Sequence, residues 1–448
     1  MLSTPPATMM SALPVWIIMV AKVMASRPPG QRRSIVSKVV ITSAVRSAIG
    51  NFGGALRAVP AYDLAAPVLN EAVKRSGIEP KDVSAVIMAQ NYQSGEYVNI
   101  SRMSLLKAGW PVEVVGFTID RRCPGGLDAI TFATMMIQTG NAEIMVAGGV
   151  ESMSTTELYL KGDIRWGVGG TGDMPKGHGS MSTWSLPLYD RMQRGRVMSQ
   201  PEERFGVLQS MMTWAETAAK EHGITRDEVD QWAVTSNLRA CAAQDNGNFK
   251  QEIVPIPIPQ GKGEPLMFSV DERPRRDTTL ESLARLKPVQ GGVCTAANSS
   301  GENDGAAACV LMSEEKAKSL GLKPLASVKG FAYSGADPRL AWKSVTAAVN
   351  LALQKTGLSL AQIDLIEIHE AFSAQILANF RELGITEKDR ERVNVNGSCV
   401  ALGHPLGATG ARILTTLINE MHRRDSKTGM IAICGGGGMG ICGIFEKS

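Results

Sequence analysis

Two stretches of this chain, 280 residues apart, resemble each other closely enough to indicate an internal duplication. The first reads AVKRSGIEPKDVSAVIM from Ala72, and the second reads ALQKTGLSLAQIDLIEI from Ala352. Each has a helical segment, a glycine suited to a helix C-cap (Gly77 and Gly357), a polar turn and an apolar run typical of a buried strand. Further strand candidates precede and follow both copies in the same order. The chain is therefore predicted to have a doubled α/β core, with strands covered on both faces.

The segment between the two copies, residues 153–302, has a different composition. Glycine, methionine, proline and polar residues dominate its first part, and a helical stretch follows over about 210–244. Thr225 and Glu228 are spaced as a capping box inside that stretch. We interpret this segment as an inserted domain that lies over a site.

The amino-terminal residues 1–34 are of another kind, because residues 1–62 contain seven Lys and Arg but no Asp or Glu. The apolar stretch from Met9 to Met24 is too short for a membrane-spanning helix of about 20 residues, and no basic region precedes it as in a secretory signal. It is either a mitochondrial transit peptide or an upstream extension with Met24 as the working start. We favour the extension, because the apolar residues show no clean helical face.

Charge and cysteine content exclude several function classes. The net charge is +4, the chain beyond the extension is close to neutral, and no run of Lys and Arg marks a nucleic-acid face. The seven cysteines are scattered and no CxxC occurs, so neither a structural zinc site nor a disulfide framework is expected. A reducing compartment fits this pattern best.

One stretch that suggests chemistry is DRRCPGGLDAI, which contains Cys123. Proline is favoured at the first helical position, so a helix is predicted to begin at Pro124 with Cys123 as its N-cap. A thiol there, next to Arg121 and Arg122, would be biased towards the nucleophilic thiolate. The alternative is a buried cysteine at a tight turn.

Two histidines lie in the second copy. His369 follows the apolar run IDLIEI directly, at the carboxyl end of a strand where α/β sheets bind ligands. It could instead be a satisfied polar residue at a strand end. His404 lies in the glycine-rich stretch NVNGSCVALGHPLGATG, and Pro405 keeps it outside regular helix. A loop constrained in this way is predicted to be functional.

The stretch CGGGGMG, from Cys434 to Gly440, formally matches a dinucleotide-binding pattern. That interpretation is rejected because the chain ends eight residues after Gly440. A cysteine beside free backbone N–H groups instead resembles an oxyanion hole. Two cysteines and two histidines together suit carbon–carbon bond chemistry on a thioester, in which one thiolate takes the acyl group and the second thiol moves a proton.

These motifs, taken with SAVRSAIGNFGGAL, VAGGVESMS, EIVPI and NSSGENDGAAACVLMSEEKA, resemble the thiolase family from about Ile35 to the C-terminus. The resemblance implies an α/β fold of two βαβαβαββ halves in five layers, α-β-α-β-α. The first half would span 35–152 and be completed by 303–322. The inserted loop domain would span 153–302, and the second half would span 323–448. Residues 1–34 would lie outside the fold.

The resemblance also implies catalytic roles. Cys123 corresponds to the acyl-accepting nucleophile, and His404 to the group that activates it and helps to bind the thioester oxygen. Cys434 corresponds to the acid/base. His369 falls where many thiolases have Asn, and the HEAF form is similar to the trifunctional-enzyme β-subunit and other branches. We expect His369 to meet charge that develops in the transition state.

Further positions match the binding of substrate. The backbone N–H groups of Cys123 and Gly436 correspond to an oxyanion hole. Ser300 corresponds to the serine that touches pantetheine, Phe372 lines the same cleft, and Met211 corresponds to the methionine of the acyl pocket. Coenzyme A and its thioesters are then substrates, and neither a further cofactor nor a metal is expected. Homodimers or homotetramers are implied, with a β-oxidation enzyme as a possible partner, in the cytoplasm or, if residues 1–34 are a transit peptide, in mitochondria.

Two departures from the family pattern stand out. The nucleophile motif is CPGG in place of CGSG or CASG, although the N–H that Pro124 lacks would be unpaired at the start of a helix anyway. Ser210 stands where short-chain members often carry His. The alternatives are another condensing enzyme of the superfamily, disfavoured by the second cysteine, and a catalytically weak, thiolase-like protein that binds lipid or coenzyme A.

Overall fold

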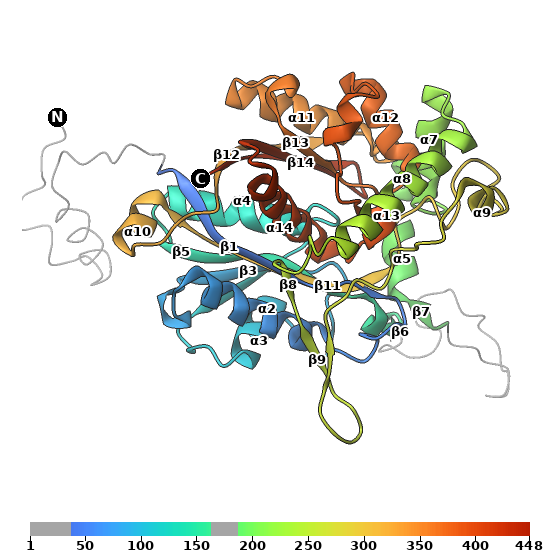
Figure 1. Cartoon of the computed structure of the whole chain (residues 1–448). Coiled ribbons are helices and arrows are strands. Elements are labelled where there is room, and N and C mark those ends of the chain that lie inside the picture. The colour runs from blue at the N-terminus through green and yellow to red at the C-terminus, as the bar shows by residue number, and fades with distance from the viewer. Residues whose placement is uncertain (1–36, 163–186) are drawn as a thin grey trace, which may run out of the picture. The chain divides into compact units, whose positions relative to one another are not determined.

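The computed structural model describes residues 37–162 and 187–448, and the described residues from Lys38 onward belong to one compact unit (Figure 1). The amino-terminal extension 1–34 lies outside the described residues, so both interpretations of it stay predictions. Within the described part of the chain, no helix is long and apolar enough to cross a membrane.

The first half of the core is a βαβαβαββ unit. Its sheet has the order β1-β11-β5-β3-β4, with β3 parallel to both β4 and β5 and with β11 antiparallel to β1 and β5. The last strand, β11, returns to this sheet after the insertion. The elements are β1 (Val39–Ser47), β2 (Gly50–Asn51), α2 (Ala61–Ser76), β3 (Ala85–Ala89), α3 (Ile100–Lys107), β4 (Val115–Ile119), α4 (Gly125–Gln138), β5 (Ile144–Ser152), β11 (Asn303–Ser313) and α10 (Glu314–Ser319).

The second half repeats this topology in the order β12-β15-β14-β13. The counterpart of β4 is reduced to one parallel bridge between Ile366 and Val393. Gly77 and Gly357 both end their helices in the left-handed conformation, with φ of 76° and 69°, which confirms the predicted repeat. The elements are β12 (Ala326–Gly335), α11 (Lys343–Thr356), β13 (Leu365–Ile368), α12 (Ser373–Leu383), α13 (Cys399–Leu402), α14 (Leu406–Arg424), β14 (Thr428–Gly435) and β15 (Met439–Lys447).

The two halves pack as five layers. Helices α2 and α3 cover one face of the first sheet, α11 and α12 cover one face of the second, and α4 and α14 lie between the two sheets (Figure 1). The sheets meet at β1 and β12, where Val40 pairs with Ser327 and Ile41 with Ala326. The α-β-α-β-α arrangement predicted from the sequence is therefore confirmed.

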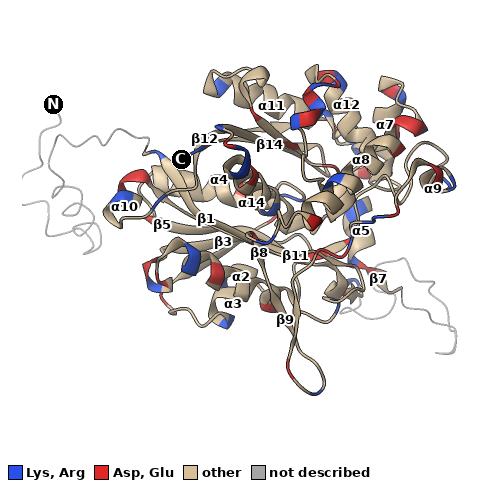
Figure 2. Cartoon of the chain, in the orientation of Figure 1, with Lys and Arg blue, Asp and Glu red and all other residues tan. Residues whose placement is uncertain are grey.

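Burial explains the composition of these layers. All nine residues of β5 are buried, as expected for a strand covered on both faces. The central helix α14 is buried over most of its circumference, because sheets lie on two sides of it. Figure 2 shows charges of both signs mixed on outer helices such as α7, α10 and α12, whereas the strands are mostly uncharged.

The inserted segment contains short hairpins and four-to-twenty-residue helices. The helical stretch predicted over 210–244 consists of two helices, because Gly223 ends the first in the left-handed conformation and Thr225 caps the second. The predicted capping box of Thr225 and Glu228 is confirmed. The elements are β6 (Leu158–Tyr159), β7 (Tyr189–Asp190), α5 (Arg191–Val197), α6 (Glu202–Phe205), α7 (Met212–His222), α8 (Arg226–Asp245), β8 (Ile253–Val254), β9 (Ile256–Ile258), β10 (Leu266–Phe268) and α9 (Leu280–Ala284). Short 3₁₀ turns occur at Pro80–Asp82, Met153–Thr155, Pro338–Leu340, Leu360–Gln362 and Asp389–Arg392.

Helices α4 and α14 cross at glycines. A Cβ atom on Gly126 would lie 2.7 Å from the Gly407 carbonyl oxygen, and one on Gly410 would lie 2.2 Å from the Leu127 backbone nitrogen. No side chain fits at either position, so the two backbones approach directly. Because one helix comes from each half of the molecule, this contact sets the distance between the two halves.

We predict that Gly410→Ala destabilises the protein, although alanine is favoured over glycine inside a helix by about 1 kcal/mol. The added methyl group has no space, and overpacking of this kind costs roughly 1–3 kcal/mol. Urea unfolding followed by tryptophan fluorescence measures the change. Gly335→Ala is the control, because nothing lies within 4 Å of a Cβ atom there. Equal stability of the two variants would show that the crossing is not tightly packed.

Candidate active site

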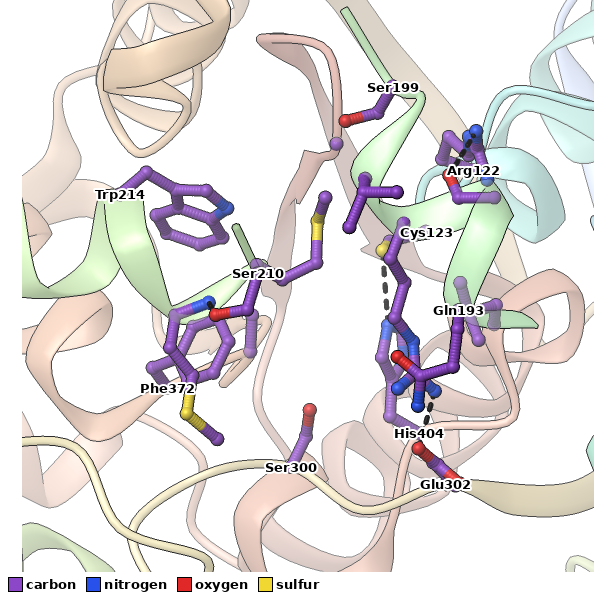
Figure 3. A pocket seen from close by; sticks show the side chains of 18 of the residues that line it. Arg122, Cys123, Gln193, Ser199, Ser210, Trp214, Ser300, Glu302, Phe372 and His404 are labelled. Carbon is purple, nitrogen blue, oxygen red and sulfur yellow. Dashed lines mark hydrogen bonds and ion pairs between the residues drawn. The ribbon is translucent and has the colours of Figure 1, made fainter. Parts of the chain in front are cut away.

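A cavity of about 270 Å³ lies between the core and the insertion (Figure 3). The strand-end loops of both halves and the segment that precedes α7 line it. Ser300 is held there by a hydrogen bond from its N–H to the Ala371 carbonyl oxygen at 3.0 Å. The predicted site residues that line this cavity are Cys123, Met211, Ser300, Phe372, His404, Cys434 and Gly436.

Cys123 lies in the loop between β4 and α4, and two details of its predicted setting are wrong. Helix α4 begins at Gly125 with Pro124 as its cap residue, so Cys123 is not the N-cap. Arg121 is engaged elsewhere, because its Nη1 donates to Asp128 Oδ1 at 2.7 Å. The helix therefore starts one residue later than predicted. Of the two arginines expected beside the Cys123 thiol, Arg121 instead pairs with Asp128.

Burial decides the protonation state of this thiol. It raises the pKa of Cys123 to about 12, and Arg122 and the backbone N–H groups of Gly436 and Cys123 lower that pKa only partly. This shift opposes the bias towards thiolate that was expected from the sequence. A base beside the thiol is then needed to make it a nucleophile.

His404 supplies an imidazole nitrogen at the required place. Its Nε2 lies 3.1 Å from Cys123 Sγ, and its Nδ1 lies 2.7 Å from the hydroxyl oxygen of Thr409. Pro405 opens helix α14 and keeps His404 in the loop before it, as predicted. Burial, Arg412 and Arg196 lower the pKa of His404 to about 3, so the ring is neutral.

Thr409 determines which nitrogen of His404 carries the proton. Its hydroxyl group donates its single proton to the Pro405 carbonyl oxygen at 3.0 Å, so it can only accept from His404. Nδ1 of His404 must then be the protonated nitrogen, and the lone pair of Nε2 faces the Cys123 thiol. The pair is therefore arranged for proton transfer from sulfur to nitrogen.

The second pair of predicted residues is Cys434 and His369. Cys434 is the next-to-last residue of β14, is buried and lines the cavity, and its Sγ lies 3.6 Å from His369 Nδ1. His369 follows β13 as predicted, but it is fully buried and does not line the cavity. Its ring lies behind the wall that Cys434 and His404 form, with a distance of 4.3 Å between the two histidine ring centroids.

The glycine-rich stretch after Cys434 is a hairpin turn between β14 and β15, which agrees with rejecting a dinucleotide site. Gly437 and Gly438 have φ of 87° and 77°, a conformation that glycine adopts readily. The N–H of Gly436 points at the Cys123 sulfur, where it favours negative charge. A Cβ on Gly436 would lie 3.3 Å from Met211 Sδ, so Met211 closes the cavity on this side.

A buried glutamate that the sequence analysis missed holds the loops of the first half. Glu151 Oε2 accepts from the N–H groups of Asn91 at 3.0 Å and Gly407 at 2.9 Å, and Oε1 accepts from Tyr92 at 3.0 Å. The carboxylate thus joins the loop after β3 to the start of α14. The motif VAGGVES, which contains this residue, was the available signal.

Glu370 plays the same part in the second half. It accepts from Trp232 Nε1 at 3.1 Å, Ser236 Oγ at 2.8 Å, Asn394 Nδ2 at 2.8 Å and the Val400 N–H at 3.0 Å. These donors come from α8 and from the loop that leads to His404. The glutamate of HEAF is therefore a structural anchor between the insertion and the core.

One wall of the cavity is polar, and sequence reasoning did not find it. Arg196 from α5 pairs with Glu302 at 2.5 Å, and Arg122 donates to the Gly195 carbonyl oxygen at 2.8 Å (Figure 3). The residues of α5 lie in the segment whose composition carries no periodic signal. Only the fold brings them next to Cys123.

A second cavity of about 360 Å³ lies beside the loop that carries Ser300. Ala296 and Ala297 of that loop line it, together with Arg273 and Arg275 from the insertion. Arg275 is exposed. This cavity therefore offers a cationic side chain next to the loop that also borders the first cavity.

A metal is poorly suited to this site. Among the described residues, ligand atoms of His369, Cys399 and His404 lie within 4.8 Å of one another. Arg412 Nη2 donates to Cys399 Sγ at 2.8 Å and is buried. That guanidinium places a positive charge against the group and disfavours a second cation.

Comparisons with known proteins agree with this geometry. A family described as "Thiolase, N-terminal domain" matches residues 39–315, and "Thiolase, C-terminal domain" matches 322–447. An acetyl-CoA acetyltransferase of Cupriavidus necator is 43% identical over 417 residues, which cover 92% of this chain and 100% of that protein. A probable acetyl-CoA acyltransferase of Staphylococcus aureus is 40% identical over 414 residues, with 92% and 100% covered. The crystal structure of the Bacillus anthracis acetyl-CoA acetyltransferase has a TM-score of 0.84 and 43% identity, and the match covers 92% of this chain and 99% of that one.

We predict that Thr409→Val slows alkylation of Cys123 by iodoacetamide at pH 7 about tenfold or more. Valine cannot accept the Nδ1 proton, so the proton moves to Nε2 and the base facing the thiol is lost; outer partners of this kind typically contribute 10–100-fold. Peptide mass spectrometry follows the reaction at Cys123. Thr409→Ser keeps the hydroxyl group and should react at the original rate. If valine and serine behave alike, Thr409 does not control the tautomer.

Proposed function

This chain belongs to the thiolase family and is an acyltransferase, and we propose that it catalyses reversible condensation and thiolysis of 3-oxoacyl-CoA and acetyl-CoA through an acyl-enzyme on Cys123. The observation that carries the proposal is the 3.1 Å contact between Cys123 Sγ and Nε2 of His404. It joins a nucleophile from one half of the fold to a base from the other half.

In the first half-reaction, His404 takes the proton of Cys123 as the sulfur attacks the thioester carbonyl carbon. The negative charge on the carbonyl oxygen develops beside the backbone N–H groups of Cys123 and Gly436. When the tetrahedral intermediate collapses, the thiol of coenzyme A leaves with the proton from His404. The neutral pair of Cys123 and His404 suits this step, because charges form on the two side chains only when the substrate is present.

In the second half-reaction, Cys434 first gives its thiol proton to the neutral ring of His404 and then, as a thiolate, removes a proton from the α carbon of acetyl-CoA. The resulting carbanion attacks the acyl group on Cys123 and forms the new carbon–carbon bond, and Cys123, which leaves as a thiolate, takes the proton from His404. Thiolysis is the same sequence in reverse. Cys434 faces the cavity that also contains Cys123, so both sulfurs reach one substrate.

The remaining cavity residues suit a coenzyme A thioester. Trp214 and Phe372 pack edge to face with ring centroids 5.1 Å apart, and Ser300 adds a hydroxyl group beside them. We propose that pantetheine passes this aromatic pair and that Met211 contacts the acyl group. The phosphates of coenzyme A would then lie in the second cavity near Arg275. These substrates suffice for the chemistry described, without a further cofactor.

Cellular context and assembly are part of the proposal. All seven cysteines are free thiols, which fits a reducing compartment. We propose the cytoplasm, or mitochondria if residues 1–34 are a transit peptide. Thiolysis would place the enzyme in β-oxidation, with a partner enzyme that supplies 3-oxoacyl-CoA. We also propose that the domains divide at 35–152 with 303–322, 153–302 and 323–448.

We further propose a homodimer formed along β4, with tetramers built from it. This strand is the edge of the first sheet, and Val115 and Phe117 on it are 48% and 45% exposed. An exposed apolar edge strand that is left unpaired tends to aggregate. A second copy of the chain paired at this edge would cover it.

The two cysteines should fail differently. Cys123→Ala removes the nucleophile, so exchange of labelled coenzyme A into acetyl-CoA and condensation should both stop. Cys434→Ala leaves Cys123, His404 and the oxyanion donors in place, so the exchange should continue while condensation falls by about 10²–10⁴-fold. Radiolabel exchange and a spectrophotometric condensation assay measure the two steps. If Cys434→Ala loses the exchange while its melting temperature stays that of the wild type, the roles assigned to the two cysteines are wrong.

We predict that Phe117→Lys yields monomers, because a charge at the edge strand opposes pairing with a second copy. Light scattering after size-exclusion chromatography gives the mass of each species. Phe132→Lys, on a 43% exposed aromatic side chain of α4, is the matched control and should leave the dimer intact. A dimer that survives Phe117→Lys would place the interface elsewhere.

A further inference from the structure

The cavity that holds Cys123 has an unbalanced positive charge. Within the described part of the chain, its charged lining residues are Arg122, Arg196 and Glu302. Arg196 and Glu302 pair with each other, with 2.5 Å between Nη2 and Oε1. Arg122 forms no ion pair with a described carboxylate, and its guanidinium donates one hydrogen bond to a described residue, the Gly195 carbonyl oxygen. Because a guanidinium has five N–H donors, most of those of Arg122 are available to a ligand.

The backbone of Arg122 adopts a conformation that is unfavourable for a residue with a side chain. Its φ is 57°, in the left-handed region that glycine adopts readily. Asp120 Oδ1 accepts a hydrogen bond from the Arg122 N–H at 2.9 Å and holds this turn. Strained backbone of this kind is concentrated at functional sites, so the position indicates a task for the guanidinium.

Helix α5 and the residues after it add polar groups to the same wall. A Cβ atom on Gly195 would lie 3.0 Å from Tyr92 Cε1 and 3.5 Å from Arg122 Nη1, so glycine makes room for both side chains. Ser199, just after α5, also lines the cavity. Its hydroxyl oxygen is buried and has no hydrogen-bond partner among the described residues. A buried polar atom of this kind calls for a partner on a bound molecule.

The polar wall lies where the acyl chain of a bound thioester would point. Figure 3 shows Trp214 and Phe372 on one side of the cavity and Arg122 and Cys123 on the other. The thioester carbon must reach the Cys123 sulfur. If pantetheine passes the aromatic pair, as proposed above, the acyl chain extends to the side of the cavity that Arg122 lines. Because Arg122 directly precedes Cys123, the far end of a short acyl chain comes within its reach.

We propose that the acyl group transferred at this site carries a terminal carboxylate, which Arg122 binds. This inference rests on the proposed function and names its substrate class, the coenzyme A thioesters of short dicarboxylic acids. A guanidinium matches a carboxylate in shape as well as in charge, since two of its N–H groups can donate to the two oxygens. An acyl chain without a charge would leave the Arg122 guanidinium unpaired in the cavity.

The carboxylate takes no part in the making or breaking of bonds. In thiolysis, the bond between the α carbon and the 3-oxo carbon breaks as the Cys123 sulfur attacks. The α carbon takes a proton from Cys434 and leaves as acetyl-CoA. The carboxylated acyl group then passes from Cys123 to a second coenzyme A, whose thiol proton restores the protonation of the site. No oxidant or reductant is needed.

Binding to a protein that cannot react tests the proposal without turnover. In the Cys123→Ala protein, calorimetry compares succinyl-CoA with butyryl-CoA and adipyl-CoA with hexanoyl-CoA, pairs that differ only in the terminal carboxylate. Hydrogen bonds to charged groups typically contribute about 10–100-fold in affinity. We expect the carboxylated member of at least one pair to bind about tenfold tighter or more, and we expect Arg122→Asn to remove this preference. Equal affinities within both pairs would overturn the proposal.

Coenzyme A alone distinguishes the acyl group from the phosphates as the partner of Arg122. The phosphates are also anionic, so a loss of affinity for succinyl-CoA has two possible sources. The protein with Arg122→Asn should bind coenzyme A as tightly as its parent does. An equal loss of affinity for coenzyme A and for succinyl-CoA would overturn the proposal, because Arg122 would then serve the phosphates.

Thiolysis gives a second readout. The ratio of kcat/KM for 3-oxoadipyl-CoA to that for the uncharged 3-oxohexanoyl-CoA is measured with and without Arg122→Asn. Any effect of Arg122 on the Cys123 thiol acts on both substrates and cancels in the ratio. We expect the ratio to fall by about tenfold or more, and an unchanged ratio would overturn the proposal. If neither substrate is cleaved by the wild type, the proposed function fails, whereas the binding preference would still support the carboxylate site.

Two controls keep the result interpretable. Arg194→Gln removes the same charge from α5, but the Arg194 guanidinium lies over the Tyr189 ring and does not line the cavity, so both preferences should persist. Asparagine is chosen at Arg122 because it tolerates the left-handed conformation better than most residues. Melting temperatures are measured for every variant, and Arg122→Gly replaces Arg122→Asn if that protein unfolds. A preference for the carboxylate that survives in a folded Arg122→Gly protein would overturn the proposal.

Discussion

The close crossing of α4 and α14 is the constraint on which the site depends. Gly126 and Gly410 lack the side chains that would separate these helices, so backbone meets backbone between the two sheets. Cys123 precedes one helix and His404 precedes the other. Neither half of the duplicated fold holds this pair alone. A nucleophile and its base meet because two repeats pack at their glycines.

Burial then sets the chemistry of the groups that have been brought together. Burial raises the pKa of Cys123 and lowers the pKa of His404, which opposes the bias expected for a cysteine near cations and a helix terminus. A hydrogen bond then determines which ring nitrogen of His404 carries the proton. Thr409 turns a lone pair of His404 towards Cys123. Charge therefore appears in this site only together with the substrate.

The sequence predicted those features that depend on local pattern. The repeat, the helix ends at Gly77 and Gly357 and the strand before Cys434 all follow from spacing and residue type. It could not predict the depth of His369 or the pKa of Cys123, because desolvation depends on which elements pack above a residue. Arg196 shows the same limit, since no periodicity marks α5 and only the fold sets it against Glu302.

The central claim is that Cys123 carries the acyl group. Brief exposure of the wild-type protein to acetyl-CoA, an acid quench and mass spectrometry of its peptides test this directly. The structure predicts one added acetyl group, on the peptide that contains Cys123 and on no other. An acetyl group on the Cys434 peptide, or acetylation that persists after Cys123→Ala, would contradict the account.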